Sequence, residues 1–271
     1  MNWGLTTKAL RESWPGTLMF GASLALVEAL LAYSLLNLQT QIAAILSQVR
    51  FLRIVFQALF GAEAAGGLGP EMVSSIPWMH PAALALIWGH AIMYCTRVPA
   101  GEVDRGTIDV LLGLPVSRWQ LYLAETVVWA LSGTVILLLG VAGNVLGNQV
   151  AQGSLGSDPG HLVIVLVNLL CLYLAVGGVA WLVSALSDRR GRAIGTVFAF
   201  CLGEFLLNYL AQFWSVADRL SFLSVLHYYR PLAILRDGTW PVRDITVLLA
   251  SAAALWTAGG VVFARRDLAT V

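Results

Sequence analysis

Six apolar runs dominate this sequence, and each is long enough to cross the hydrocarbon core of a membrane, which takes about 20 residues in a helix. They cover about residues 16–36, 76–96, 121–146, 162–186, 193–214 and 245–263. Charged residues make up only 11% of the chain, whereas a soluble domain carries about a quarter. The sequence therefore predicts an all-α integral membrane protein, with six transmembrane helices in a single domain over residues 1–271.

The distribution of lysine and arginine predicts the orientation, because these residues resist translocation and stay in the cytoplasm. With the N-terminus inside, the inner segments hold ten of the 16 lysines and arginines, and the outer segments hold six. The short loop 147–161 on the outer side holds none. We therefore expect both termini in the cytoplasm.

Two segments on the expected outer side have patterns of their own. Residues 42–60 repeat apolar side chains at steps of three and four, which predicts an amphipathic helix in the membrane interface or against a partner. Residues 215–241 mix aromatic residues with prolines, which is typical of an aromatic belt at the level of the lipid headgroups. An anchoring role is the expectation for this second segment.

The sequence lacks the motifs of several catalytic classes. Its only lysine, Lys8, does not follow a glycine-rich loop, so the chain has no phosphate-binding loop with which to hydrolyse ATP. The four histidines and three cysteines have no metal-ligand spacing, and we expect Cys95, Cys171 and Cys201 to be core thiols. The net charge of +1 gives no basic surface for nucleic acid. We therefore expect neither an enzyme nor a bound cofactor or metal in this chain.

The segment between the second and third spans has the pattern of a short amphipathic helix that begins at Glu102. At 100° per residue its apolar residues share one face and its charged residues another: Val103, Thr107, Val110, Leu111 and Leu114 against Glu102, Arg105 and Asp109. Pro115 ends this helix, and Ser117 followed by Gln120 has the capping-box spacing that starts the third span. From these residues alone, a membrane anchor and a protein-docking helix are equally open.

The same segment carries an ordered series of motifs: a glutamate, then Gly-Thr-aliphatic-acidic, then Leu-Leu, then Pro-aliphatic-Ser-Arg. Here these are Glu102, Gly106-Thr107-Ile108-Asp109, Leu111-Leu112 and Pro115-Val116-Ser117-Arg118. In this series the chain resembles the permease subunits of ATP-binding-cassette transporters of the type-2 exporter class. The resemblance extends to an N-terminal interfacial segment at residues 8–12, a basic turn at 187–190 and the tail 263–268, and only the region 42–70 is untypical.

The resemblance implies a dimer of six-span subunits, with itself or a close paralogue, that exports a substrate using two copies of a separate ATPase subunit. ATP and Mg²⁺ would bind to that ATPase, and the complex would lie in the bacterial inner membrane. The helix after the second span would be the element that couples the two subunits. The residues implied in ATPase coupling are Glu102, Val103, Arg105, Gly106, Thr107, Asp109, Val110, Leu111, Leu112, Pro115 and Arg118. We expect the apolar residues among them to be buried against the ATPase and the charged ones to lie at the rim.

Four polar residues lie within the predicted spans, where they are costly unless they face protein or water. They are Glu28 in the first span, His90 in the second, and Glu204 and Asn208 in the fifth. They either line a substrate path or form hydrogen bonds that fix helix packing. Glu125, near the inner end of the third span, is expected to be interfacial.

Two functions besides export stay open at this point. The protein could transmit ATPase motion to an extracytoplasmic partner without moving a solute. It could instead be an ion-coupled secondary transporter that uses Glu28, His90 and Glu204. The substrate itself cannot be read from the sequence, because intramembrane pockets are apolar in all three cases.

Overall fold

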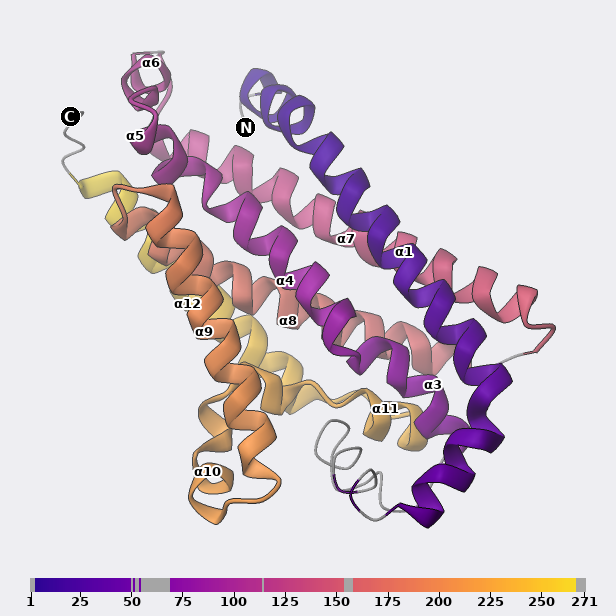
Figure 1. Cartoon of the computed structure of the whole chain (residues 1–271). Helices are drawn as coiled ribbons and strands as arrows, with labels where there is room; N and C mark the ends of the chain where they lie inside the picture. The colour runs from indigo at the N-terminus through magenta and orange to yellow at the C-terminus, as the bar shows by residue number, and fades with distance from the viewer. Residues whose placement is uncertain are drawn as a thin grey trace.

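The structure is a computed structural model and describes residues 3–49, 51, 54, 69–113, 115–153 and 158–266. Every regular element in these ranges is helical, as Figure 1 shows, which confirms the expected all-α fold. The elements are α1 (Trp3–Gln48), α3 (Pro70–Met79), α4 (Pro81–Cys95), η2 (Arg97–Gly101), α5 (Glu102–Asp104), α6 (Ile108–Leu112), α7 (Arg118–Val150), α8 (Pro159–Leu186), α9 (Arg190–Ala211), α10 (Ser215–Leu220), η3 (Ser221–Leu223), η4 (Val225–Tyr228), α11 (Pro231–Asp237) and α12 (Val242–Arg265).

Five of these helices are long and apolar enough to cross a membrane: α1, α7, α8, α9 and α12. The sequence predicted a sixth, at 76–96, and there the structure has two helices in succession, α3 and α4. The break lies at His80, because Pro81 disfavours helical geometry in the residue before it and is well suited to the first position of a new helix. At 1.5 Å per residue, α3 and α4 together rise about 37 Å, enough to cross a bilayer as a pair.

Small residues let the helices approach closely. A Cβ on Gly143 of α7 would lie 2.0 Å from the carbonyl oxygen of Ala25 in α1, and one on Gly178 of α8 would lie 2.9 Å from that of Ala252 in α12. Such contacts are typical of membrane helices, which gain from van der Waals packing where backbones meet. They join α1 to α7 and α8 to α12.

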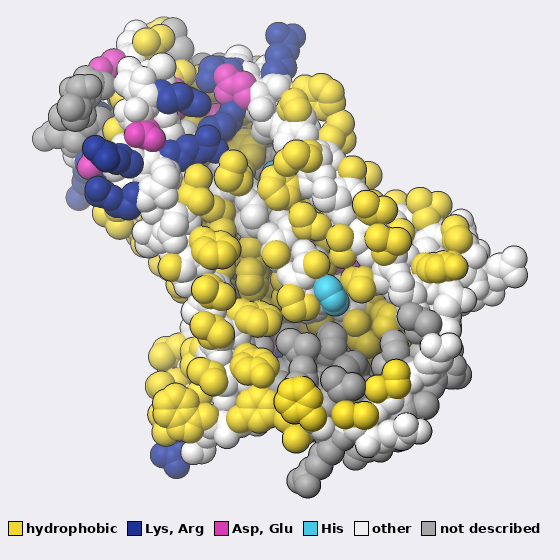
Figure 2. All heavy atoms as spheres, viewed as in Figure 1, with side chains coloured by type: hydrophobic (Ala, Val, Ile, Leu, Met, Phe, Trp, Pro, Cys, Tyr) yellow, Lys and Arg dark blue, Asp and Glu magenta, His cyan; other side chains and the backbone are white. Residues whose placement is uncertain are grey.

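Both described ends of the chain lie at one end of the bundle, together with α5 and α6 (Figure 1). We call this end the terminal face. Charged side chains gather there, whereas the rest of the visible surface is mostly hydrophobic (Figure 2). Residues 8–12 belong to α1, which runs unbroken from Trp3 to Gln48 with Pro15 inside it. The expected helix 42–60 begins within α1, and residues 50, 52–53 and 55–68 lie outside the described residues.

The segment 215–241, expected to be an aromatic belt, folds at the opposite end into four short helices, α10, η3, η4 and α11. Tyr228 and Tyr229 are buried, which differs from the expectation of headgroup anchors. The Tyr229 hydroxyl donates to the carbonyl of Trp78, and Asn168 of α8 donates to the carbonyl of Tyr228, each at 3.1 Å. Buried tyrosines keep a polar tip that needs a partner, and here backbone carbonyls supply it.

Candidate functional site

The chain leaves α4 through a buried bend, residues 97–101. Val98 there has an extended backbone (φ −131°, ψ 130°), so the chain changes direction between α4 and α5. Val98, Pro99, Ala100 and Gly101 are all buried. A bend packed on all sides holds the angle between α4 and the segment after it, since a packed core resists deformation.

The segment after the bend is two short helices, where the sequence predicted one. They are separated at Gly106, whose φ of +67° is a left-handed conformation that glycine adopts without strain. Glu102 closes the turn, because its carboxylate accepts hydrogen bonds from Arg105 and from the hydroxyl of Thr107. Glu102 is buried and bonded within the segment, so it is not the exposed rim residue that we expected.

Breaking the helix also separates its expected apolar face. Val110 is 73% exposed, whereas Leu111 is 7% exposed and packs in the protein core with Ile108. The two neighbouring side chains therefore have different surroundings. Of the two, Val110 is the one available to another subunit. The side chain of Leu112 and all of Leu114 lie outside the described residues.

A groove on the terminal face separates α5 and α6 from the first turns of α1. Its volume is about 510 Å³, and its lining consists of Lys8, Glu12, Arg97, Glu102, Arg105, Thr107, Val110 and Leu111. The groove combines both charge signs with one exposed apolar side chain, a composition suited to a protein partner. The sequence pointed to both lining segments, but only the fold brings them together.

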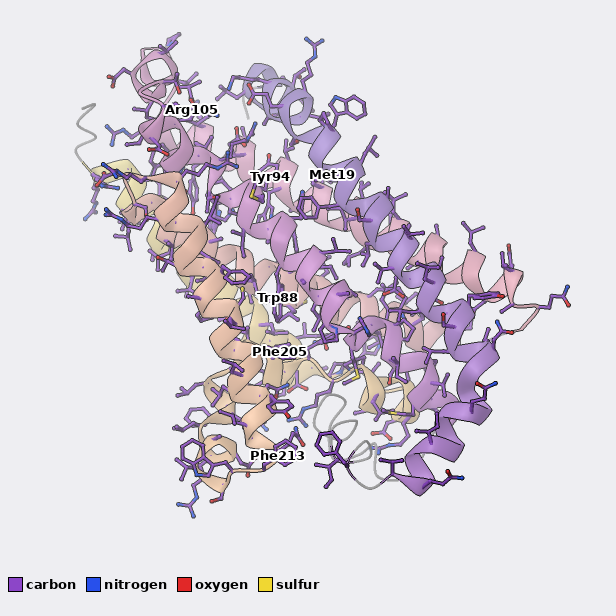
Figure 3. All side chains as sticks on the ribbon, in the orientation of Figure 1. Met19, Trp88, Tyr94, Arg105, Phe205 and Phe213 are labelled. Carbon is purple, nitrogen blue, oxygen red and sulfur yellow. The ribbon has the colours of Figure 1, made fainter. Side chains whose placement is uncertain are left out.

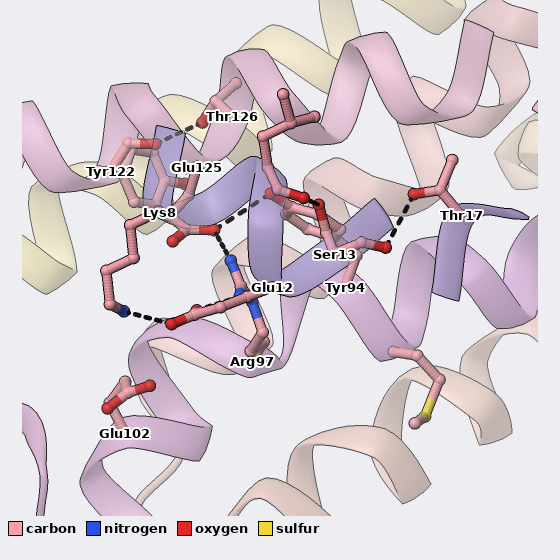
Figure 4. Close-up of polar contacts among 12 residues, drawn as sticks. Lys8, Glu12, Ser13, Thr17, Tyr94, Arg97, Glu102, Tyr122, Glu125 and Thr126 are labelled. Carbon is pink, nitrogen blue, oxygen red and sulfur yellow. Dashed lines mark hydrogen bonds and ion pairs between the residues drawn. The ribbon is translucent and has the colours of Figure 1, made fainter. Parts of the chain in front are cut away.

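At the wall of this groove, the charge network in Figure 4 ties the bend to two other helices. Arg97 pairs with Glu125 of α7 and with Glu12 of α1, and the hydroxyl of Tyr94 donates to Glu125 at 3.1 Å. Burial lowers the pKa of Arg97, but Glu125, with smaller effects of Tyr94 and Glu12, more than offsets this and leaves the pKa above its ordinary value. Glu125, expected to be interfacial, is buried.

Two arginines join the ends of three helices at the terminal face. Arg118, at the start of α7, donates to the carbonyls of Phe263 (3.0 Å) and Arg266 (2.6 Å) at the end of α12. Arg266 in turn donates to the carbonyl of Ala185 (2.9 Å) in the last turn of α8. Cations are favourable at helix C-termini, where carbonyls lack intrahelical partners. The guanidinium of Arg118, implied in ATPase coupling, is thus directed to α12.

The start of α7 follows the sequence prediction. The amide of Gln120 donates to the hydroxyl of Ser117 at 3.2 Å, and the amide of Ser117 donates to the side chain of Gln120 at 2.9 Å. This is the predicted capping box, and it satisfies two amides at the helix start.

The polar residues of the spans lie in three separate places. Glu28 accepts a hydrogen bond from Asn144 of α7 (3.1 Å), and His90 bonds to the hydroxyl of Tyr173 in α8 (3.0 Å). Glu204 accepts the amide hydrogen of Val225 in η4 (2.7 Å), with half-buried Asn208 one turn further along α9. Each of the three ionisable residues links a different pair of elements.

An apolar groove between α4 and α9 was not predicted from the sequence. It has a volume of about 250 Å³ and is lined by Pro81, Ala85, Trp88, Gly89, Ile92, Phe198, Cys201, Leu202 and Phe205. Trp88 and Phe205 are labelled in Figure 3, on α4 and α9. Apolar residues such as Phe198 and Leu202 would look the same in the sequence whether they lined a groove or faced lipid. No sequence signal could therefore have found this groove.

Five helices long and apolar enough to cross a membrane, together with the α3–α4 pair, define a multi-pass membrane protein. The chain belongs to the ABC-2 family, since the model of the ABC-2 family transporter protein matches residues 17–268. No curated protein and no solved structure matches the chain.

Membership confirms the resemblance seen in the sequence and makes the chain a membrane subunit of an ABC transporter. Such a transporter includes an ATPase partner, and the membrane subunit is typically not itself catalytic.

Proposed function

We propose that this permease receives the movement of its ATPase partner at the groove on the terminal face and uses it to export a substrate. The supporting observation is the exposed side chain of Val110, carried on an element whose attachment to α4 is a buried bend. An apolar tip can dock into another subunit, while a fixed joint passes the displacement on. Because ATP is cytoplasmic, the terminal face and both termini would lie in the cytoplasm, with ATP and Mg²⁺ on the ATPase.

The groove charges favour a polar rim around this apolar contact. Lys8, Glu12 and Arg105 each have about half of their side chain exposed and can pair with opposite charges on the ATPase. Rim charges mainly steer association and fix register. We further propose two ATPase copies on a permease dimer, in the bacterial inner membrane, as the resemblance implies.

For the substrate we favour contact at the apolar groove between α4 and α9 over the polar residues of the spans. Glu28, His90 and Glu204 each have a hydrogen-bond partner on a neighbouring element, which supports a packing role for them. Their separation also gives little support to an ion-coupled carrier that uses all three.

A second function keeps specific support. The turn after α9 and the short helix η3 present Phe213, Trp214, Phe222 and Leu223 at the end opposite the terminal face. Exposed apolar clusters mark contacts with lipid or protein. Through such a surface the permease could pass motion to an extracytoplasmic partner without moving a solute. Substrate-independent ATPase stimulation together with capture of such a partner would favour this function.

The test of ATPase coupling is Val110→Asp, in full-length permease coexpressed with candidate ATPase subunits of the same organism. A charge placed in a desolvated contact should weaken copurification and ATPase stimulation about tenfold. The matched control is Val242→Asp, an equally exposed valine at the start of α12 at the opposite end. Equal ATPase stimulation in the two variants would count against the proposal.

A further inference from the structure

The fifth span, α9, begins without a cap of its own. Its N-cap residue is Arg189, whose side chain accepts no capping hydrogen bond, and the first turn of this fully described helix contains no acidic residue. Arg190 and Arg192 follow instead. Since the N-terminus of a helix carries partial positive charge, basic residues there are unfavourable and an acidic one is favourable.

An acidic residue for the start of α9 is supplied by the coupling element, by which we mean α5 and α6. Asp104, the last residue of α5, accepts the backbone amide hydrogen of Arg190 at 3.2 Å. A carboxylate on a helix N-terminal amide has the chemistry of an N-cap, although here it lies 86 residues away in sequence. Helix α5 therefore caps α9 from outside.

The side chain of Arg190 makes a second contact, from α9 to α4. Its guanidinium donates to the carbonyl of Met93 in the last turn of α4 at 2.9 Å. The side chain passes over Gly101 of the bend, where a Cβ would lie 3.1 Å from the Cδ of Arg190. Two reciprocal contacts thus join α9 to both sides of the bend.

Helix α9 is also the span that should move most easily. Of its most apolar stretch 17% is buried within the chain, compared with 61% for α8. Fewer internal contacts mean a lower cost of displacement. In Figure 1, α9 runs along the side of the bundle from the bend region to α10.

From these contacts we propose that Asp104 is a positioning residue through which a displacement of α5 and α6 reaches α9. The proposal rests on the function proposed above, in which an ATPase moves the coupling element. If α5 moves, α9 either follows or loses its cap, and following is favoured because α9 has the smallest buried share of the five long helices. The covalent connection moves α4, and the Asp104 contact moves α9 with it.

The test uses spin labels on the full-length permease, reconstituted with its ATPase in nanodiscs. One label replaces Leu210 near the far end of α9 and the other replaces Val150 at the far end of α7. Both positions are exposed, and the three native cysteines are buried and so poorly accessible to the label. The measurement is the change in label distance between the nucleotide-free state and the state trapped with ATP and vanadate.

In the otherwise unaltered protein the distance should change. Asp104→Ala should remove about half or more of that change, whereas Asp104→Asn should keep most of it, because the amide oxygen still accepts from Arg190. The control is Asp188→Ala, which removes an acid from the turn before α9 that pairs with Arg266 and not with α5. An Asp104→Ala protein that moves like the parent overturns this inference alone.

Failure of the proposed function gives a different result. If the unaltered permease shows no nucleotide-dependent change in label distance and does not stimulate its ATPase, the proposed ATPase coupling and this inference both fail. A second measurement needs no ATPase: hydrogen exchange at the Arg190 amide should be about fivefold faster in Asp104→Ala, as expected for loss of a cap. Unchanged exchange would show that the carboxylate does not cap α9, and would overturn the inference.

Discussion

The guanidinium of Arg97 binds the carboxylate of Glu125 at a place where the two side chains are only 13% and 4% exposed. The pair joins the bend after α4 to α7, and Glu12 adds α1 to the same cation. A buried ion pair adds little net stability, but removing one partner leaves an uncompensated charge.

Glu125→Ala should therefore be severely destabilising, by about 3–5 kcal/mol, because it leaves the buried cation of Arg97 with one half-exposed partner. The comparison is Glu12→Ala, at the exposed end of the network, which should cost about 1 kcal/mol or less. Unfolding midpoints in detergent or nanodiscs measure both. Similar midpoints for the two variants would contradict a buried network.

Leu111→Ala and Val110→Ala should differ although the residues are adjacent. The leucine is buried, so its truncation should cost about 2–5 kcal/mol, while truncation of the exposed valine should cost about 0.5 kcal/mol or less. Thermal unfolding of the permease without its ATPase checks this. If Leu111→Ala leaves the unfolding midpoint unchanged, the side chain of Leu111 is not buried in the permease and this prediction is wrong.

Gly143→Val should disrupt the contact of α7 with α1, because a Cβ there would lie 2.0 Å from the carbonyl of Ala25. We expect a large loss of folded yield, since a backbone atom cannot move aside cheaply. Gly195→Ala on α9 is the matched control, as its Cβ would meet no described atom within 4 Å. Fluorescence size-exclusion profiles compare the two, and a normal profile for Gly143→Val would argue against this helix pair.

Arg118→Ala should lower stability by about 1–2 kcal/mol, because the last carbonyls of α12 lose their donor. ATPase copurification should be retained, since this side chain is occupied within the permease. The control is Arg265→Ala, at an exposed position in the last turn of α12. It should change neither the stability of the permease nor its copurification with the ATPase. Loss of ATPase binding in Arg118→Ala without loss of stability would assign the residue to the partner contact instead.

The segment 215–241 should loosen at acidic pH through His227. Burial and Arg230 lower the pKa of this histidine below 6.5, against smaller opposing effects of Asp218 and Asp244. With the folded pKa below the unfolded one, its contribution is complete above about pH 6.5 and is lost progressively as pH falls towards the folded value. Limited proteolysis between about pH 7.5 and 5 measures this loosening. His227→Gln should remove the pH dependence, and a variant that keeps it would exclude this histidine as its cause.

The sequence by itself determined the membrane class, the approximate spans, the family motif after the second span and the capping box at Ser117 and Gln120. Each of these depends on local pattern: apolar length, residue type and spacing within a few positions. Even the break at His80 has a local cause in Pro81, although the length of the apolar run concealed it.

Only the tertiary structure decided which motif residues are available to a partner. Val110 and Leu111 are both aliphatic, and only the way in which α6 packs on the core leaves Val110 exposed and Leu111 buried. The contacts of Glu125, Asp104 and Arg118 depend on partners 28, 86 and up to 148 residues away. Helical periodicity assigns a side chain to a face but cannot say which distant helix meets that face, because that follows from how all the helices pack together.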